Sequence, residues 1–85
     1  MKAQRVLKVS EIRRHIIRIE RILRRLKKFE EKYAMSTEEF VEKWNRGEIS
    51  GTGDMNKIAD FMAWGADYEQ LLKMLDELVR FVRGS

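Results

Sequence analysis

The sequence has no cysteine and no proline, and His15 is the only histidine among its 85 residues. Disulfide bonds and thiolate-bound zinc are therefore excluded as sources of stability. A single histidine makes no metal site, so we interpret His15 as a packing or surface residue and expect no bound metal. A chain of this length forms at most one small domain with a limited core. Long paired helices or a self-associating dimer are the natural ways for it to bury more surface.

Segments and motifs of several functional classes are also missing. No apolar run approaches the roughly 18 residues of a membrane span, and residues 1–9 lack the apolar stretch of a signal peptide. We therefore expect a cytoplasmic protein with no membrane partner. There is no nucleophile motif such as G-x-S-x-G, and Ser50–Gly53 lacks the lysine and the preceding strand of a phosphate-binding loop. We expect no enzymatic activity and no cofactor.

Charge is abundant and unevenly distributed. Charged residues make up 38% of the chain, well above the usual quarter, which fits long helices with charged outer faces. Residues 1–34 contain twelve Lys or Arg and four Asp or Glu, whereas residues 35–85 contain six and ten. This asymmetry predicts two surfaces with different partners, or one half that neutralises the other.

Residues 10–32 predict a long basic helix that follows an N-terminal arm over residues 1–9. Ser10 is the expected N-cap. The 4,3,4,3 spacing of a heptad seam is formed by Ile12, Ile16, Ile19, Leu23 and Leu26. Ile17, Ile22 and Phe29 widen this stripe, which favours packing against more than one neighbour. Residues 3–9 also fit a short strand, as in ribbon-helix-helix repressors, but the long helix that follows disfavours that alternative.

Basic residues cover the rest of this helix. The six arginines are Arg13, Arg14, Arg18, Arg21, Arg24 and Arg25. Such a cluster can neutralise several phosphates and bind nucleic acid without regard to sequence. The alternative, which we favour, is a solvated face whose charges pair with acidic residues of the second half.

The stretch from Tyr33 to Glu48 predicts a turn and a short helix over residues 36–46. Ser36 and Glu39 have the spacing of a capping box, and Met35 and Phe40 that of a hydrophobic staple. Gly47 is expected to end the helix in a left-handed conformation. So short a helix is not stable alone and must dock on the rest of the chain.

A third helix is predicted over residues 54–83, with Asp54 as its N-cap. A second heptad seam is formed by Ile58, Phe61, Gly65, Tyr68, Leu72, Leu75, Val79 and Val82. The interior Gly65 predicts either a bend or break, or the close approach of a neighbouring helix. The sequence thus predicts an all-α fold. Two long heptad-patterned helices, joined by a short one, form a hairpin, and two hairpins form a dimeric bundle.

Aromatic and acidic residues gather in the second half. One interpretation is that Phe40, Trp44 and Trp64 are core residues, since large aromatics dominate burial in small domains. The other is a binding hot spot for a basic partner. The candidate contact residues are Phe40, Trp44, Asp60, Trp64 and Tyr68.

A family resemblance rests on several short matches. They are Tyr33-Ala34-Met35-Ser36, Glu38-Glu39-Phe40, Gly47-Glu48, Asp60, Trp64 and Tyr68-Glu69. The pattern resembles that of small prokaryotic proteins, common in archaea, taken to be antitoxins of type II toxin–antitoxin modules, of the TumA kind. Ala34 stands where the pattern has glycine. The resemblance implies a small toxin as partner and binding to operator DNA. A nucleic-acid-binding helical protein and a purely structural helical oligomer are the alternatives.

Overall fold

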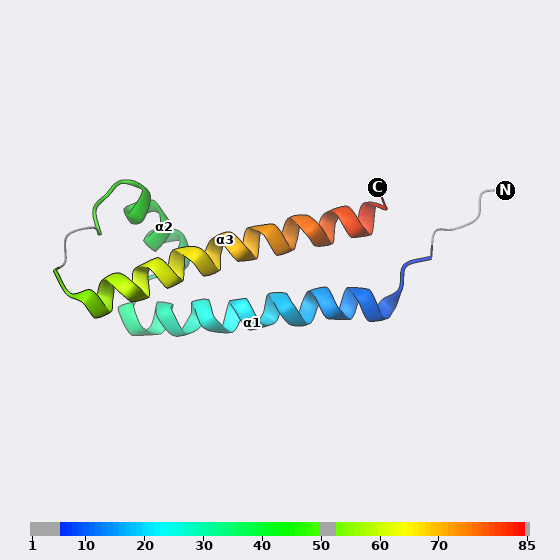
Figure 1. Ribbon diagram of the computed structural model, residues 1–85, viewed down its shortest axis with the longest axis horizontal. Helices are drawn as coiled ribbons and strands as arrows, with labels where there is room; N and C mark the ends of the chain where they lie inside the picture. Colours follow the sequence, from blue (N-terminus) through cyan, green and yellow to red (C-terminus); the bar gives the residue numbers. More distant parts are fainter. Residues whose placement is uncertain (1–5, 50–52, 85) are drawn as a thin grey trace.

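The computed structural model is an antiparallel helical hairpin with a short third helix at its closed end (Figure 1). It describes residues 6–49 and 53–84. Helix α1 spans Val9–Tyr33, α2 spans Thr37–Asn45 and α3 spans Met55–Arg83. Helices α1 and α3 lie side by side, and α2 lies against them where the chain turns. The predicted all-α hairpin is confirmed. None of the described helices is long and apolar enough to cross a membrane.

Helix α1 begins earlier than predicted. Lys8 has an extended backbone, and its carbonyl accepts from the N–H groups of Glu11 and Ile12 at 3.1 and 3.2 Å. Ser10 therefore lies inside the first turn, and its prediction as N-cap was wrong. Residues 6–8 precede the helix without forming a strand, and the rest of the alternative strand over residues 3–9 lies either within α1 or outside the described residues.

The caps of α2 and α3 are those that the sequence predicts. The Ser36 hydroxyl accepts from the Glu39 N–H at 3.1 Å and donates to the Glu39 carboxylate at 3.2 Å. The Asp54 carboxylate accepts from the Asn56 N–H at 2.9 Å. Each bond satisfies a backbone donor that the first turn of a helix leaves without an internal partner.

Helix α2 ends in a Schellman motif. The Glu48 N–H donates to the Lys43 carbonyl at 2.9 Å, and the Gly47 N–H donates to the Trp44 carbonyl at 3.1 Å. Gly47 has a φ of 74°, which is the left-handed conformation that this motif requires. The predicted glycine stop is confirmed.

The two long helices meet along heptad lines. The α1 line is Ile12, His15, Ile19, Ile22, Leu26, Phe29 and Tyr33, all buried or half-buried. The α3 line is Asp60, Trp64, Asp67, Leu71, Met74, Leu78 and Phe81, also buried or half-buried. The rings of His15 and Phe81 lie 5.4 Å apart near the open end. Those of Phe29 and Trp64 lie 5.6 Å apart near the closed end.

Several predicted seam residues lie outside this interface. Their side chains are 40–48% exposed and form what we call the open apolar face: Ile16, Leu23, Leu72, Leu75, Val79 and Val82. Their assignment to the helix–helix seam was wrong for the hairpin. Each helix carries two adjacent apolar lines, and the lines with the larger rings, Phe29 and Trp64, take the inner position because they bury more area.

The most deeply buried part of the core lies at the closed end. Phe40 and Trp64 have no exposed surface, and their rings stack in parallel with centroids 4.1 Å apart. Phe61 and Tyr33 pack around them, with ring centroids 5.0 Å apart. Burial of a phenylalanine contributes roughly 1.5–3 kcal/mol. The burial of Phe40 therefore helps to hold the short helix α2 on the hairpin.

Candidate protein-binding surface

A chain of hydrogen bonds fixes α2 against both long helices. The Trp64 indole N–H of α3 donates to the Thr37 hydroxyl of α2 at 3.1 Å. That hydroxyl and the Thr37 N–H each donate to the Glu30 carboxylate of α1 at 2.8 Å. Neither Thr37 nor Glu30 was singled out in the sequence, because their spacing to Trp64 follows no helix period. The three residues hold the surface between α2 and α3 in one arrangement.

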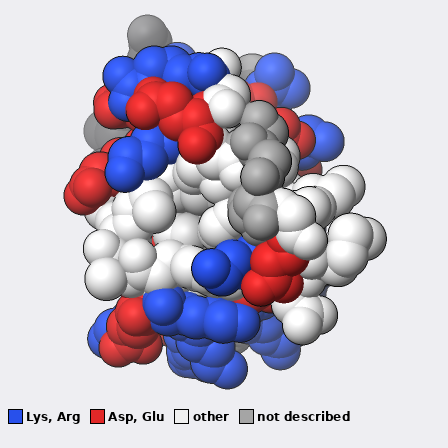
Figure 2. Space-filling model, turned by 90° about the vertical axis from the view of Figure 1, so that its left-hand side faces the viewer, with Lys and Arg blue, Asp and Glu red and all other residues white. Residues whose placement is uncertain are grey.

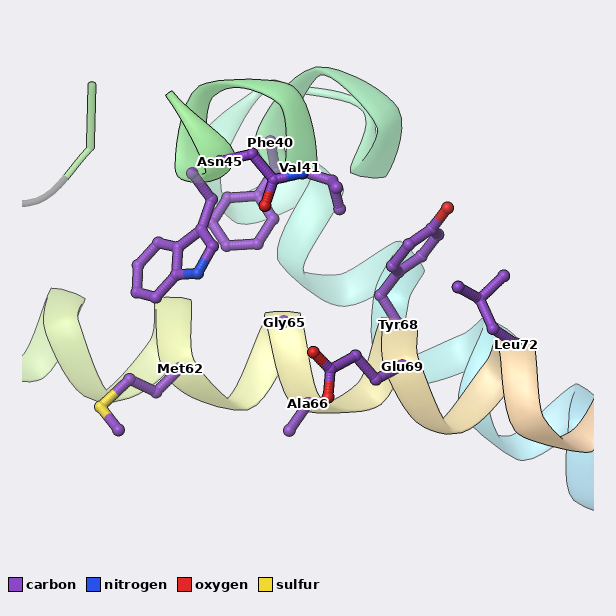
Figure 3. A pocket seen from close by; sticks show the side chains of 10 residues that line it. Phe40, Val41, Asn45, Met62, Gly65, Ala66, Tyr68, Glu69 and Leu72 are labelled. Atoms are coloured by element: carbon purple, nitrogen blue, oxygen red, sulfur yellow. The ribbon is translucent and has the colours of Figure 1, made fainter. Parts of the chain in front are cut away.

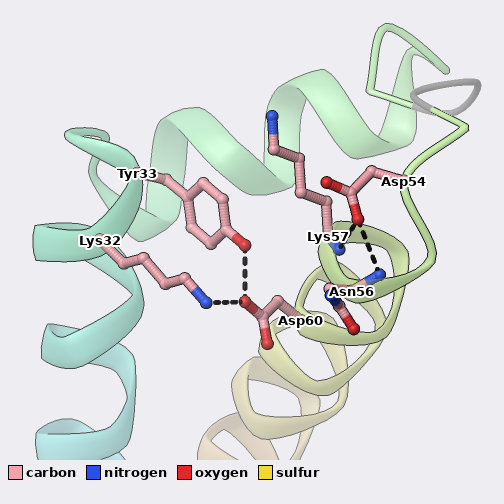
Figure 4. A network of polar contacts seen from close by, with 6 residues as sticks. All are labelled: Lys32, Tyr33, Asp54, Asn56, Lys57 and Asp60. Atoms are coloured by element: carbon pink, nitrogen blue, oxygen red, sulfur yellow. Dashed lines mark hydrogen bonds and ion pairs between the residues drawn. The ribbon is translucent and has the colours of Figure 1, made fainter.

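A second polar cluster joins the end of α1 to the start of α3 (Figure 4). One carboxylate oxygen of Asp60 accepts from the Lys32 ammonium and from the Tyr33 hydroxyl, both at 2.6 Å. The hydrogen bond from Lys32 is the main cause of a lowered pKa at Asp60, and the same bond raises the pKa of Lys32. Burial, followed by the bond to Asp60, raises the pKa of Tyr33.

The five predicted partner-contact residues fall into three groups. Phe40 and Trp64 are core residues, so their prediction as contact residues was wrong, because both rings point into the hairpin. Asp60 is engaged within the chain by Lys32 and Tyr33. Trp44 is 37% exposed and Tyr68 is half-buried. These last two residues remain available to a partner.

Trp44 and Tyr68 line a groove of about 440 Å³ between α2 and α3, which we call the α2–α3 groove (Figure 3). The other lining residues are Phe40, Val41, Asn45, Met62, Gly65, Ala66, Glu69 and Leu72. Tyr68 and Leu72 extend from α3 toward the side on which α2 lies. Glu69 is the one charged residue in this lining.

Gly65 lies in the α3 wall of the groove. Helix α3 runs through it without a break, so the predicted interruption does not occur. A Cβ atom added to Gly65 would have no atom within 4 Å apart from its immediate chain neighbours and the helix backbone. The hairpin therefore does not use the missing side chain for the close approach of another helix. Space for a side chain is open at this point.

The predicted neutralisation of the basic helix is realised only in part. Arg25 pairs with the buried Asp67 at 2.9 Å, and Arg24 contacts Glu20 at 3.9 Å. Among the arginines of α1, four have no acidic partner within residues 6–49 and 53–84: Arg13, Arg14, Arg18 and Arg21. The favoured interpretation, in which these charges pair with acidic residues of the second half, was wrong for these four arginines. Helix α3 has few carboxylates at the same height along the hairpin.

The exposed cations form a stripe along α1, which we call the basic ridge: Arg14, Arg18, Arg21, Arg25 and Lys28. Their 4,3,4,3 spacing places them on one side of the helix. Figure 2 shows Lys and Arg gathered along the lower edge of the molecule, where α1 lies. In the described part of the chain, no three His, Asp or Glu side chains are placed to hold a metal ion.

Comparison of the chain with protein-family models, with curated proteins and with solved structures gives no match. The function is therefore argued from the groove, the open apolar face and the basic ridge themselves.

Proposed function

We propose that the chain is a protein-binding module of the antitoxin type, which binds a small toxin in the α2–α3 groove. Gly65 is the observation that carries the proposal. A glycine inside a helix costs about 1 kcal/mol relative to alanine, and the packing of the hairpin gives no reason for it. A partner side chain that inserts against the α3 backbone requires that space.

The lining of the groove indicates the chemistry of this partner. Trp44 is 37% exposed and Met62 is 61% exposed. This aromatic and apolar surface favours a large apolar anchor residue on the partner. Glu69 beside it favours a neighbouring Lys or Arg on the partner. The surplus of acidic over basic residues in residues 35–85 extends this preference to a basic protein. A basic toxin that acts on nucleic acid, as the family resemblance implies, has these properties.

A homodimer is the second part of the proposal. The open apolar face leaves six large side chains partly exposed on one small chain. Contiguous apolar surface of this kind marks interaction sites on proteins. A dimer of hairpins would bury it in a four-helix arrangement.

Co-purification tests the module directly. The tagged chain is co-expressed with the small protein encoded by the neighbouring reading frame. Trp44→Ala should reduce the recovered partner at least tenfold, because it removes one wall of the groove. Met55→Ala, which removes a side chain that is 76% exposed and lies outside the groove, is the matched control. Equal recovery with both variants would contradict the proposed site.

Binding of nucleic acid is the second candidate function, and the four arginines without acidic partners favour it. Each phosphate contact adds roughly −0.9 to the slope of log affinity against log salt on duplex DNA. A variant with Arg14, Arg18 and Arg21 replaced by Gln should have a shallower slope by about 3. A gel-shift series without binding at low salt would eliminate this function.

A further inference from the structure

Helix α2 covers only part of one flank of the hairpin. On α1, Ile16 and Leu23 belong to a heptad line that continues to Glu30, which bonds to the first residue of α2. On α3, Tyr68 and Leu72 line the α2–α3 groove. These residues of α1 and α3 therefore lie on one flank of the hairpin. Helix α2 covers this flank at the closed end and leaves it uncovered toward the open end. The open apolar face is the uncovered continuation of the surface on which α2 docks.

The exposed area is large for a chain of this size. The chain exposes 6799 Å², whereas a compact monomer of the same mass would expose about 5,300 Å². The excess is spread over the whole chain, and on this flank it includes the six side chains of the open apolar face, which are 40–48% exposed. Coverage of this flank by another protein surface would supply the burial that the hairpin lacks.

We propose that a second copy of this chain covers the open apolar face, in a two-fold dimer whose closed ends point in opposite directions. The inference rests on the homodimer in the proposed function and adds the relative direction of the two hairpins. With the closed ends together, the two α2 helices would compete for the same space. With the closed ends apart, the two open halves meet and each α2 lies beyond the contact.

This symmetry determines which helices meet. Two helical hairpins packed face to face with opposite directions are related by a two-fold axis perpendicular to the helices. Each α1 then lies antiparallel to the other α1, and each α3 to the other α3. Because His15 lies against Phe81 and Arg25 against Asp67, Ile16 is level with about Val79. The axis passes close to Ile16, at the middle of the open apolar face.

Charges at the rim of the α1 contact match across this axis. Arg13 and Glu20 are exposed, and they lie four residues after Val9 and Ile16 respectively, at the edge of the open apolar face. They flank Ile16 by three and four residues. Antiparallel pairing about a point between Ile16 and Ile17 therefore brings Arg13 opposite Glu20 of the second copy. The contact is self-complementary, because the same pair forms twice.

On α3, the same axis passes close to Val79, which is a member of the open apolar face. An arrangement with the closed ends together would instead place α1 against the α3 of the second copy and would not bring Arg13 opposite Glu20.

Solution mass tests the interface. Light scattering of the full chain over a range of concentrations should give the mass of two chains. Leu75→Lys should give the mass of one chain with unchanged helix content, since Leu75 is 40% exposed and outside the core. Met55→Lys, at a side chain near the closed end that is 76% exposed, should remain dimeric. A wild-type monomer at every concentration would overturn the homodimer itself and leave partner binding in the groove untouched.

Engineered cysteines test the direction, and the absence of native cysteine makes each pairing unambiguous. Under mild oxidation, Ile16→Cys should form a covalent dimer because the residue lies next to the axis. Leu23→Cys, with similar exposure, is the matched control: about 20 Å would separate the two copies of residue 23, too far for a disulfide. A disulfide at Leu23→Cys, or between mixed Ile16→Cys and Val79→Cys chains, would overturn the arrangement while leaving the homodimer in place.

Discussion

The indole N–H of Trp64 donates to the hydroxyl of Thr37 across 3.1 Å, and both side chains are buried. The same hydroxyl donates onward to Glu30, so each of the three helices supplies one member of a single chain of hydrogen bonds. Helix α2 has nine residues and would not be stable in isolation. Its position, and with it the shape of the α2–α3 groove, depends on Thr37 and on the stacked ring of Phe40.

Replacement of Thr37 by Val tests this dependence. Valine preserves the shape of the side chain but leaves the buried Trp64 N–H without an acceptor, which costs about 1–3 kcal/mol of the free energy of unfolding. Urea unfolding followed by circular dichroism measures the change. Thr37→Ser, which keeps the hydroxyl, should lower the free energy of unfolding by less than Thr37→Val does. Equal stability of wild type and Thr37→Val would show that the bond does not hold α2.

The end of α1 contains a strained residue. Ala34 has a φ of 51°, a left-handed conformation that costs a residue with a Cβ roughly 1–2 kcal/mol. Ala34→Gly should therefore raise the free energy of unfolding by about 1 kcal/mol. Ala59→Gly, at an exposed position inside α3, should lower it by a similar amount. Destabilisation by both substitutions would contradict the left-handed cap.

The cluster around Asp60 predicts a dependence of stability on pH. The pKa of Asp60 is lowered in the fold. Its contribution to the free energy of unfolding is therefore present when the pH is above the pKa in the unfolded chain, about 3.9. It is lost as pH falls through the folded pKa. The difference in free energy of unfolding between wild type and Asp60→Asn should be constant from about pH 5 to 8 and shrink below about pH 4. A difference that persisted unchanged at pH 2 would contradict this assignment.

At alkaline pH, stability depends on pH in the opposite direction and falls as the pH rises. The pKa values of Lys32 and Tyr33 are raised, so their contributions are complete below the unfolded values near 10. They are lost as pH rises through the folded pKa values. The stability advantage of wild type over Asp60→Asn should therefore also decline above about pH 10.

Local signals in the sequence predicted the helix ends well where a side chain makes the cap. Ser36, Asp54 and Gly47 each act within a few residues of their own position. Lys8 caps α1 with its backbone alone and gives no side-chain signal, which is why Ser10 was chosen in error. Contacts such as Glu30 with Thr37 depend on how the chain turns at Ala34 and have no local signature.

The apolar pattern predicted two long helices but not which line of each faces the other. Ile16 and Leu72 fit a heptad seam as well as Ile22 and Leu71 do, because both helices carry wide stripes. The choice between the lines is made by Phe40 and Trp64, whose stack at the closed end sets the rotation of α3. The same stack determines which aromatic residues a partner can reach. Phe40 and Trp64 are buried in the core, whereas Trp44 and Tyr68 line the groove with exposed surface.

The most direct test of the proposed module is the affinity of the neighbouring-frame protein for the Gly65→Leu variant, measured by calorimetry. A leucine at position 65 extends into the α2–α3 groove, and its Cβ has no atom within 4 Å apart from its chain neighbours and the helix backbone. Helix content should be retained, because leucine is a better helix former than glycine. Ala63→Leu, at an exposed position outside the groove, should bind like wild type. The account predicts a dissociation constant at least tenfold higher for Gly65→Leu, and an unchanged constant would contradict it.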